Sequence, residues 1–260
     1  MSVNACAAAV QSGDPDRFLA AMAAPPHARA VLFPIFAYNL EIARAPYVTS
    51  EPMLAEIRLQ WWRDALEEIR TGQTPRRHEV VEPLAAILDA PTCETLTRIA
   101  DARRWDIEGE PFLSEAQFRA HIDASSGNLL WSAAHLLGAT DEGAVRKLAF
   151  ADGLARWFQA VPEMRARNMA PLVDDSDDAL RALAEEALDG VKGLRLSQPA
   201  RHSTLSAADA VALLKAVVQD PARVRDGGLT VSEFGKRWRR LVLSLIQSDA
   251  ADDLTRVDLG

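Results

Sequence analysis

Four aspartates close together, Asp174, Asp175, Asp177 and Asp178, are the side chains in this sequence best suited to metal chemistry. Carboxylate oxygens are the ligands that hard cations such as Mg²⁺ prefer. The same residues, however, directly precede an amphipathic helical pattern. Carboxylates at a helix N-terminus satisfy free N–H groups and interact favourably with the helix dipole. We therefore predict that the four aspartates begin a helix and do not hold a metal ion.

The other reactive side chains are dispersed along the sequence. No histidine is paired with a cysteine or carboxylate at a spacing typical of metal sites; the five are His27, His78, His121, His135 and His202. The two cysteines, Cys6 and Cys93, lie far apart, which favours a reducing compartment. The sequence has no phosphate-binding glycine loop and no nucleophile elbow. These residues alone therefore indicate no catalytic centre.

A basic cluster near the end of the sequence is the remaining charged feature. Lys236, Arg237, Arg239 and Arg240 flank Trp238, which belongs to an apolar stripe from Val231 to Leu245. We interpret the four cations as the solvated face of a final helix. The alternative is docking of this face to an anionic membrane surface or an acidic partner.

Composition limits the class of protein. The 260 residues are 48% hydrophobic and 25% charged, and the net charge is −8. An acidic balance disfavours nucleic acid as a partner. No window is long and apolar enough to be a transmembrane segment, and the first residues do not resemble a secretory signal. We expect one domain spanning residues 1–260, located in the cytoplasm.

Helical periodicity recurs throughout, and no segment shows the alternation typical of a strand. Residues 27–42 are apolar nearly all round, which predicts a central, buried helix that Pro34 would kink. A helix opened by Pro52 carries an apolar stripe that includes Trp61, which we expect in the core. Trp62 would then form an exposed recognition patch with Arg58 and Arg63. A capping box at Ser114 predicts a helix that runs to Gly138, and a helix from Ala144 is expected to end at Pro162.

Two segments in the first quarter of the sequence resemble a known family. Residues 36–44 read FAYNLEIAR, and residues 57–66 read IRLQWWRDAL. This pair resembles the squalene/phytoene synthase family, and within it a divergent branch that is similar to the mitochondrial complex I assembly factor. The similarity is strongest over residues 14–171, within a family-like region of about 14–247. It implies an all-α, multi-helix bundle of the isoprenoid-synthase type with a central cavity.

The resemblance also implies a chemistry. Active members hold two substrate diphosphates through Mg²⁺, because divalent cations neutralise the charge that develops on a diphosphate leaving group. Carboxylates four residues apart on one helix share a face, and two such helices would form the cage. Asp106 and Gly127 fit other family positions, which support the fold.

The positions where the family places its two Asp-rich motifs differ in this sequence. The first motif falls on Ala43, Arg44 and Tyr47, with Glu41 as the only carboxylate nearby. The second should follow Gly153-Leu154-Ala155 and falls on Glu163 and Met164. We therefore expect both halves of the magnesium cage to be lost, with no catalytic residue, metal ligand or cofactor assigned. Arg44 would take space from the metals only if it points into the cavity.

Three functions remain open. The first is a non-catalytic protein that acts by binding, with a protein partner in the assembly of respiratory complex I, in the cytoplasm or at the periphery of the inner membrane. The second is an active prenyltransferase of isoprenoid biosynthesis that condenses two allylic prenyl diphosphates with Mg²⁺. The third keeps the apolar cavity and binds an isoprenoid or other lipid without turnover.

Overall fold

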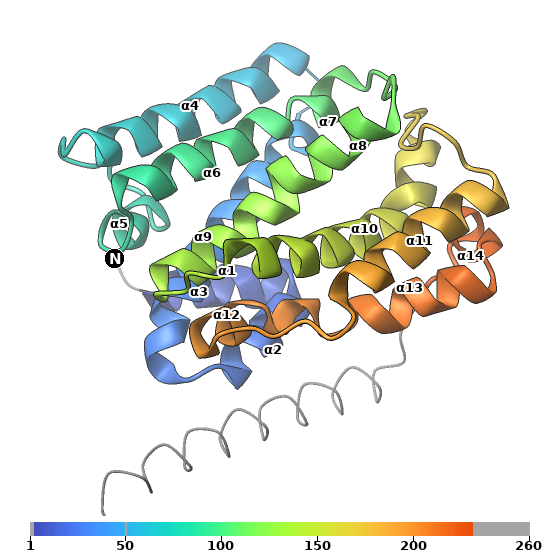
Figure 1. The fold of residues 1–260 in the computed structure, drawn as a ribbon. Helices are drawn as coiled ribbons and strands as arrows, with labels where there is room; N and C mark the ends of the chain where they lie inside the picture. Colours follow the sequence, from blue (N-terminus) through green and yellow to red (C-terminus); the bar gives the residue numbers. More distant parts are fainter. Residues whose placement is uncertain (1–2, 50, 231–260) are drawn as a thin grey trace, which may run out of the picture.

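The computed structural model describes residues 3–49 and 51–230, and within these ranges it contains helices and no strand (Figure 1). The first half consists of α1 (Val3–Gly13), α2 (Pro15–Ala23), α3 (Pro26–Arg44), the 3₁₀ turn η1 (Ala45–Tyr47), α4 (Pro52–Arg70), α5 (Val81–Ala85) and α6 (Ala90–Ala102). The middle consists of α7 (Trp105–Glu108), α8 (Glu115–Ile122), the π turn η2 (Asp123–Gly127), α9 (Asn128–Leu136) and α10 (Glu142–Ala166). The last part consists of α11 (Asp177–Val191), α12 (Gln198–Ser203), η3 (Leu205–Ala207), α13 (Ala210–Gln219) and α14 (Ala222–Asp226). The expected all-α bundle is confirmed.

Two helices form the centre of the bundle. α3 packs against α1 and α9, and α10 packs against α9, η2, α11 and α13 (Figure 1). Most of α3 from Leu32 to Asn39 is buried, as its apolar residues on every face predict. Pro34 lies inside α3, which runs unbroken from Pro26 to Arg44.

The buried apolar side chains form two clusters. The first joins α1, α3, α4, α6, α9 and the start of α10, and includes Leu32, Leu59 and Val145. The second joins α8, α11, α13, α14 and the rest of α10, and includes Phe118, Leu154 and Phe158. α10 therefore contributes side chains to both clusters.

The predicted end of a helix at Pro162 is wrong. α10 continues through Pro162 to Ala166. A proline inside a helix removes one hydrogen bond and costs about 3 kcal/mol. Burial of Val161 and Met164 on either side of it offsets that cost. The predicted helix from Ser114 to Gly138 is present as α8 and α9, but the π turn interrupts it.

The predicted buried face of α4 is also wrong. Trp62 is only 4% exposed and packs edge-on against Tyr38, with ring centres 5.4 Å apart, whereas Trp61 is half-buried. Ile57, four residues before Trp61 on the same apolar stripe, is 56% exposed. The recognition patch expected at Arg58, Trp62 and Arg63 is therefore not one exposed surface: Arg58 is exposed, Trp62 is buried and Arg63 pairs with Asp101 of α6.

Two further expectations concern the membrane and the end of the sequence. None of the helices in residues 3–49 and 51–230 has the length and apolar character needed to cross a bilayer. The final helix expected from Val231, with Trp238 and the basic cluster Lys236, Arg237, Arg239 and Arg240, lies outside the described residues.

Candidate functional site

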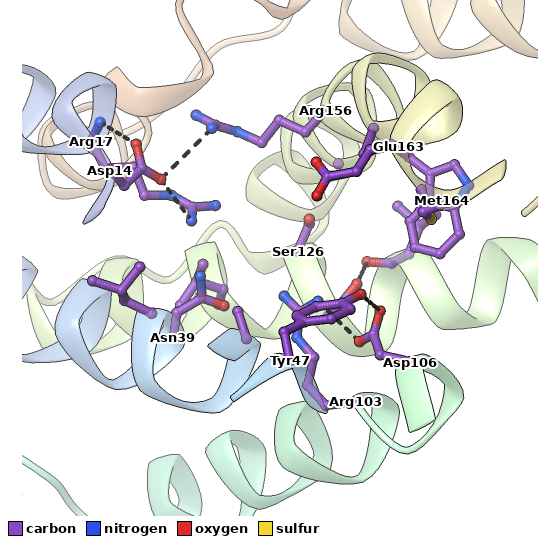
Figure 2. Close-up of a pocket in the computed structure, with 18 of the residues that line it drawn as sticks. Asp14, Arg17, Asn39, Tyr47, Arg103, Asp106, Ser126, Arg156, Glu163 and Met164 are labelled. Carbon is purple, nitrogen blue, oxygen red and sulfur yellow. Dashed lines mark hydrogen bonds and ion pairs between the residues drawn. The ribbon is translucent and has the colours of Figure 1, made fainter. Parts of the chain in front are cut away.

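A cavity of about 400 Å³ opens between the start of α2, the end of α3 with η1, the π turn and the second half of α10 (Figure 2). Its charged lining consists of four arginines and three carboxylates, namely Arg17, Arg103, Arg156, Arg167, Asp14, Asp106 and Glu163. The remaining lining includes Asn39, Ala43, Tyr47, Ser125, Ser126, Gly153, Trp157 and Met164. The charged side chains therefore decide which ligands the cavity fits.

One end of the cavity is built by the first turn of α2. Asp14 is the N-cap of this helix, and its carboxylate accepts a hydrogen bond from the backbone N–H of Arg17 at 2.9 Å. The same carboxylate pairs with the Arg17 guanidinium at 3.3 Å and lies 3.9 Å from that of Arg156 (Figure 2). The cap thus fixes a carboxylate and an arginine at the cavity wall.

Arg156 reaches the same end from α10. Its Nε donates to both carboxylate oxygens of the buried Asp152, each at 3.0 Å, and its Nη2 donates to the carbonyl of Ser206 at 3.0 Å. Asp152 and Arg156 are four residues apart on one helix, so their side chains share a face. This pairing holds Arg156 in place against the cavity.

The opposite end is built by η1 and α7. The Tyr47 hydroxyl donates to Oδ1 of Asp106 at 3.0 Å, and Arg103 pairs with the other oxygen of that carboxylate at 3.3 Å (Figure 2). Burial and the neighbouring Asp106 carboxylate together raise the pKa of Tyr47 well above its usual range. Tyr47 is therefore a hydrogen-bond donor, and no base, at neutral pH.

Arg167, directly after the last residue of α10, connects that helix to the end of the cavity that Tyr47 and Asp106 form. Its guanidinium pairs with Glu163 at 2.6 Å, and its guanidinium carbon lies 4.2 Å from the centre of the Tyr47 ring. A cation over an aromatic face is attracted by the negative potential of the ring. Tyr47 and Glu163, which come from different helical segments, are thus connected through one arginine.

The wall between the two ends depends on a close approach of α10 to the π turn. A Cβ atom on Gly153 would lie only 2.7 Å from the Cβ and Oγ of Ser126. Only glycine fits at this distance. The Gly153-Leu154-Ala155 segment therefore has a packing role beside the cavity.

The sequence-predicted positions fall into two groups. Ala43, Tyr47, Glu163 and Met164 all line the cavity, so the structure brings the two motif positions together. Glu41 and Arg44 are not part of the lining, and Arg44 is exposed, with its guanidinium close to Gly13. Arg44 therefore takes no space inside the cavity.

Sequence reasoning did not single out Arg103, Arg156 or Trp157 as lining residues. Arg156 stands four residues after Asp152 beside the Gly153-Leu154-Ala155 segment, and this spacing was a usable signal for an ion pair. Arg103 pairs with Asp106 at a spacing of three, but its place in the cavity depends on the contact between α7 and η1 that Asp106 and Tyr47 make.

The aspartate cluster begins a helix, as predicted. Ser176 is the N-cap of α11, and its backbone N–H donates to Asp174 at 2.8 Å. The other three aspartates pair with arginines: Asp175 with Arg165, Asp177 with Arg225, and Asp178 with Arg181. Each carboxylate is thus engaged by the protein itself.

Comparison with known sequences gives one family and a group of named relatives. A family model described as squalene/phytoene synthase matches residues 10–168. The chain is 22% identical over 161 residues to NADH dehydrogenase (ubiquinone) complex I, assembly factor 6, of Homo sapiens, covering 60% of the chain and 48% of that protein. The protein of the same name from Mus musculus is 22% identical over 174 residues, covering 65% and 52%. The chain spans about half the length of the curated relatives it matches.

Comparison with solved structures gives the same fold. A dehydrosqualene synthase in complex with ligand superposes with a TM-score of 0.68 at 13% identity, covering 96% of each chain. Squalene synthase HpnC from Alicyclobacillus acidocaldarius superposes with a TM-score of 0.66 at 15% identity, covering 88% of this chain and 95% of that one. At these identities the similarity describes the fold of the bundle.

Proposed function

The chain belongs to the squalene/phytoene synthase family, and we propose that it acts by binding, without prenyl transfer, in the assembly of respiratory complex I. The observation that carries this proposal is that each of the three carboxylates lining the cavity is already paired with an arginine. The role in assembly is inferred from the names of the curated relatives.

The first support comes from testing the cavity against the Mg²⁺ ions that the family implies. Mg²⁺ requires several oxygen ligands in near-octahedral geometry. Asp14, Asp106 and Glu163 instead accept hydrogen bonds from guanidinium groups, and the four lining arginines outnumber these three carboxylates. These residues, as arranged, do not fit a magnesium cage.

The second support comes from the motif positions themselves. Ala43 and Met164 line the cavity, and their side chains have no oxygen that could bind a cation. Tyr47 and Glu163 are connected through Arg167, so their oxygens are not directed at a shared cation. We infer that both Asp-rich motifs of the family are lost in this chain.

A turnover assay tests the non-catalytic part of the proposal. Purified, folded protein is incubated with farnesyl or geranylgeranyl diphosphate and Mg²⁺, and released diphosphate is measured against a blank and against an active family member. We expect no release above the blank. Mg²⁺-dependent release would contradict the proposal and favour the alternative, an active prenyltransferase that joins two allylic prenyl diphosphates.

A gene deletion tests the role in assembly. In the organism that carries the gene, we expect deletion to lower NADH:quinone oxidoreductase activity while squalene and carotenoid levels stay normal, and the intact gene to restore the activity. Normal oxidoreductase activity with lost squalene or pigment would reverse the proposal. If deletion lowers the oxidoreductase activity, as we expect, the partner is a respiratory-complex subunit or intermediate in the cytoplasm or at the periphery of the inner membrane.

Retention of the cavity favours one further candidate. A cavity of about 400 Å³ persists beside the apolar clusters, so it has room for part of a small ligand. An isoprenoid or other lipid held without turnover would fit both the fold and the missing metal ligands. Mass spectrometry of the purified protein would detect a co-purifying prenyl lipid.

A further inference from the structure

A groove of about 580 Å³ lies between α10, the connection from α11 to α12, η3 and the start of α13. It shares no lining residue with the cavity between α2, η1 and α10. Its wall is mostly apolar, and Leu148, Leu194, Leu196 and Val211 are only half-buried there. A segment that covers these side chains would remove apolar surface from water, which is favourable.

Two arginines line this groove without a partner among the described residues. In residues 3–49 and 51–230, no acceptor pairs with the guanidinium group of Arg195 or of Arg201. All four arginines that line the cavity, by contrast, pair with a carboxylate. The groove thus combines an apolar wall with two positive charges that no ion pair within the described residues neutralises.

The described part of the chain ends beside α10. Leu229 is only 3% exposed, and its carbonyl accepts a hydrogen bond from Nε2 of Gln159 at 3.1 Å. Gln159 and Leu148 are eleven residues apart in α10, which is about three turns, so they lie on one face about 16 Å apart. A helix that runs back along α10 from Val231 would therefore need about eleven residues to reach the groove.

The sequence eleven residues beyond Thr230 complements the groove. Residues 241–246 read LVLSLI, which is an apolar run of the length that the groove could cover. Asp249, Asp252 and Asp253 follow, and residues 247–253 include no lysine or arginine. The apolar run matches the wall, and the carboxylates match the two arginines in charge.

We propose that residues 241–253 of this chain dock in the groove, with the apolar run against Leu148 and Val211 and the aspartates beside Arg195 and Arg201. The contact is within one chain. It does not depend on whether the protein transfers prenyl groups or acts in complex I assembly.

The groove is connected to the cavity through η3. Leu205 and Ala207 line the groove, and the carbonyl of Ser206 between them accepts a hydrogen bond from Nη2 of Arg156 at 3.0 Å. Arg156 lines the cavity. The docked segment thus supports the turn that holds this arginine.

Cysteine cross-linking in the full chain tests the contact. Val211→Cys is combined with Leu245→Cys, and in parallel with Leu241→Cys, because these two positions are one helical turn apart. Disulfide formation under mild oxidation is followed by non-reducing electrophoresis and peptide mass mapping. Thr74→Cys, exposed in the connection between α4 and α5, replaces Val211→Cys in the matched control. The buried Cys6 and Cys93 are present throughout.

We expect at least one groove pair to link within the chain at least tenfold faster than its control pair. Linkage no faster than the control in both pairs would overturn the proposal. Linkage between two chains would also overturn it, because the segment in the groove would then belong to a second copy.

Hydrogen exchange measures the contribution of the charges, because protection of the amides of residues 241–246 reports the stability of the docked state. Arg195→Glu together with Arg201→Glu should lower this protection at least tenfold, as expected for the loss of two partly exposed ion pairs. Adding Asp249→Lys, Asp252→Lys and Asp253→Lys should restore it.

The exposed Arg77 provides the control, and Arg77→Glu should leave the protection unchanged. If the variant with both groove arginines reversed does not fold, the exposed Arg195→Glu alone decides, with an expected loss of at least threefold. Unprotected amides at residues 241–246 in the unaltered protein, or protection that the reversals do not change, would overturn the proposal.

Discussion

Arg167 lies over the face of Tyr47, with its guanidinium carbon 4.2 Å from the ring centre, while the same guanidinium pairs with Glu163. Tyr47 and Glu163, which fall where we expect the two family motifs, are thereby connected through Arg167. The family resemblance implies that an active member uses the corresponding space for metal ions and diphosphate. The arginine therefore connects η1 to the end of α10, and its pairing with Glu163 supports our proposal that the cavity holds no cation.

A double-mutant cycle measures the strength of the contact between Arg167 and Tyr47. We expect Tyr47→Leu and Arg167→Met to show a coupling of about 0.5–1 kcal/mol in urea unfolding, as is typical of an exposed cation–π pair. Tyr47→Phe retains the ring and loses only the hydrogen bond to Asp106, so it should keep the coupling to Arg167. Strictly additive effects of the Leu and Met variants would show that the contact contributes nothing to stability.

His121 should make stability depend on pH. It lies among aromatic rings, with Trp157 at 5.1 Å and Phe112 at 5.4 Å between ring centres, and burial lowers its pKa from 6.5 to about 4. Between these two pH values the unfolded chain binds the proton and the folded chain does not, so stability falls as the pH falls. Full protonation of His121 should lower the free energy of unfolding by about 3 kcal/mol.

The measurement is the free energy of unfolding between pH 7 and pH 4, for the protein and for His121→Phe. We expect the variant to lose much of the slope. Some slope should remain, because burial also lowers the pKa of His202. His135, which is half-buried and pairs with Asp89 away from these aromatic rings, serves as the control, and His135→Gln should leave this part of the profile in place. An unchanged slope in His121→Phe would contradict the assignment.

Trp62 should contribute more to stability than Trp61. Trp62→Ala removes a buried indole and should cost about 3–5 kcal/mol. Trp61 is half-buried, with Arg76 over its ring at 4.8 Å, and Trp61→Ala should cost less than half as much. Urea unfolding of the two variants gives the ranking directly. If Trp61→Ala cost more than Trp62→Ala, the buried face of α4 would be the one that the sequence pattern predicts.

Gly153 should not tolerate a methyl group. Gly153→Ala places a carbon 2.7 Å from Ser126, and we expect a loss of about 1–3 kcal/mol despite the better helix propensity of alanine. Gly143 lies in the same helix with no atom within 4 Å of a Cβ, so Gly143→Ala should be neutral or slightly stabilising. Thermal unfolding of the two variants separates the effect of close packing from that of helix propensity. Equal melting temperatures would rule out the close approach of Gly153 to Ser126.

The sequence was most informative where local pattern decides the structure. The buried α3, the helix start at Asp174–Asp178 and the joint placement of Ala43, Tyr47, Glu163 and Met164 at one cavity all follow from periodicity, capping and the family motifs. These features depend on neighbours in sequence or on a known fold. They required no knowledge of distant contacts.

The remaining features depend on contacts between distant segments. Two apolar faces of α4 lie about 100° apart, and tertiary packing, which includes Trp62 against Tyr38, selects the face with Trp62. The pairing of Asp14 with Arg156 joins α2 to α10, which no spacing in the sequence predicts. The continuation of α10 past Pro162 likewise depends on the tertiary burial of Val161 and Met164.

The sharing of α10 between the two apolar clusters bears on how the molecule unfolds. Val145 belongs to one cluster and Phe158 to the other, on a single helix of 25 residues. Neither half of the bundle can release this helix without exposing apolar surface of the other half. The two clusters are therefore expected to melt as one cooperative unit, with the cavity lying beside the helix that couples them.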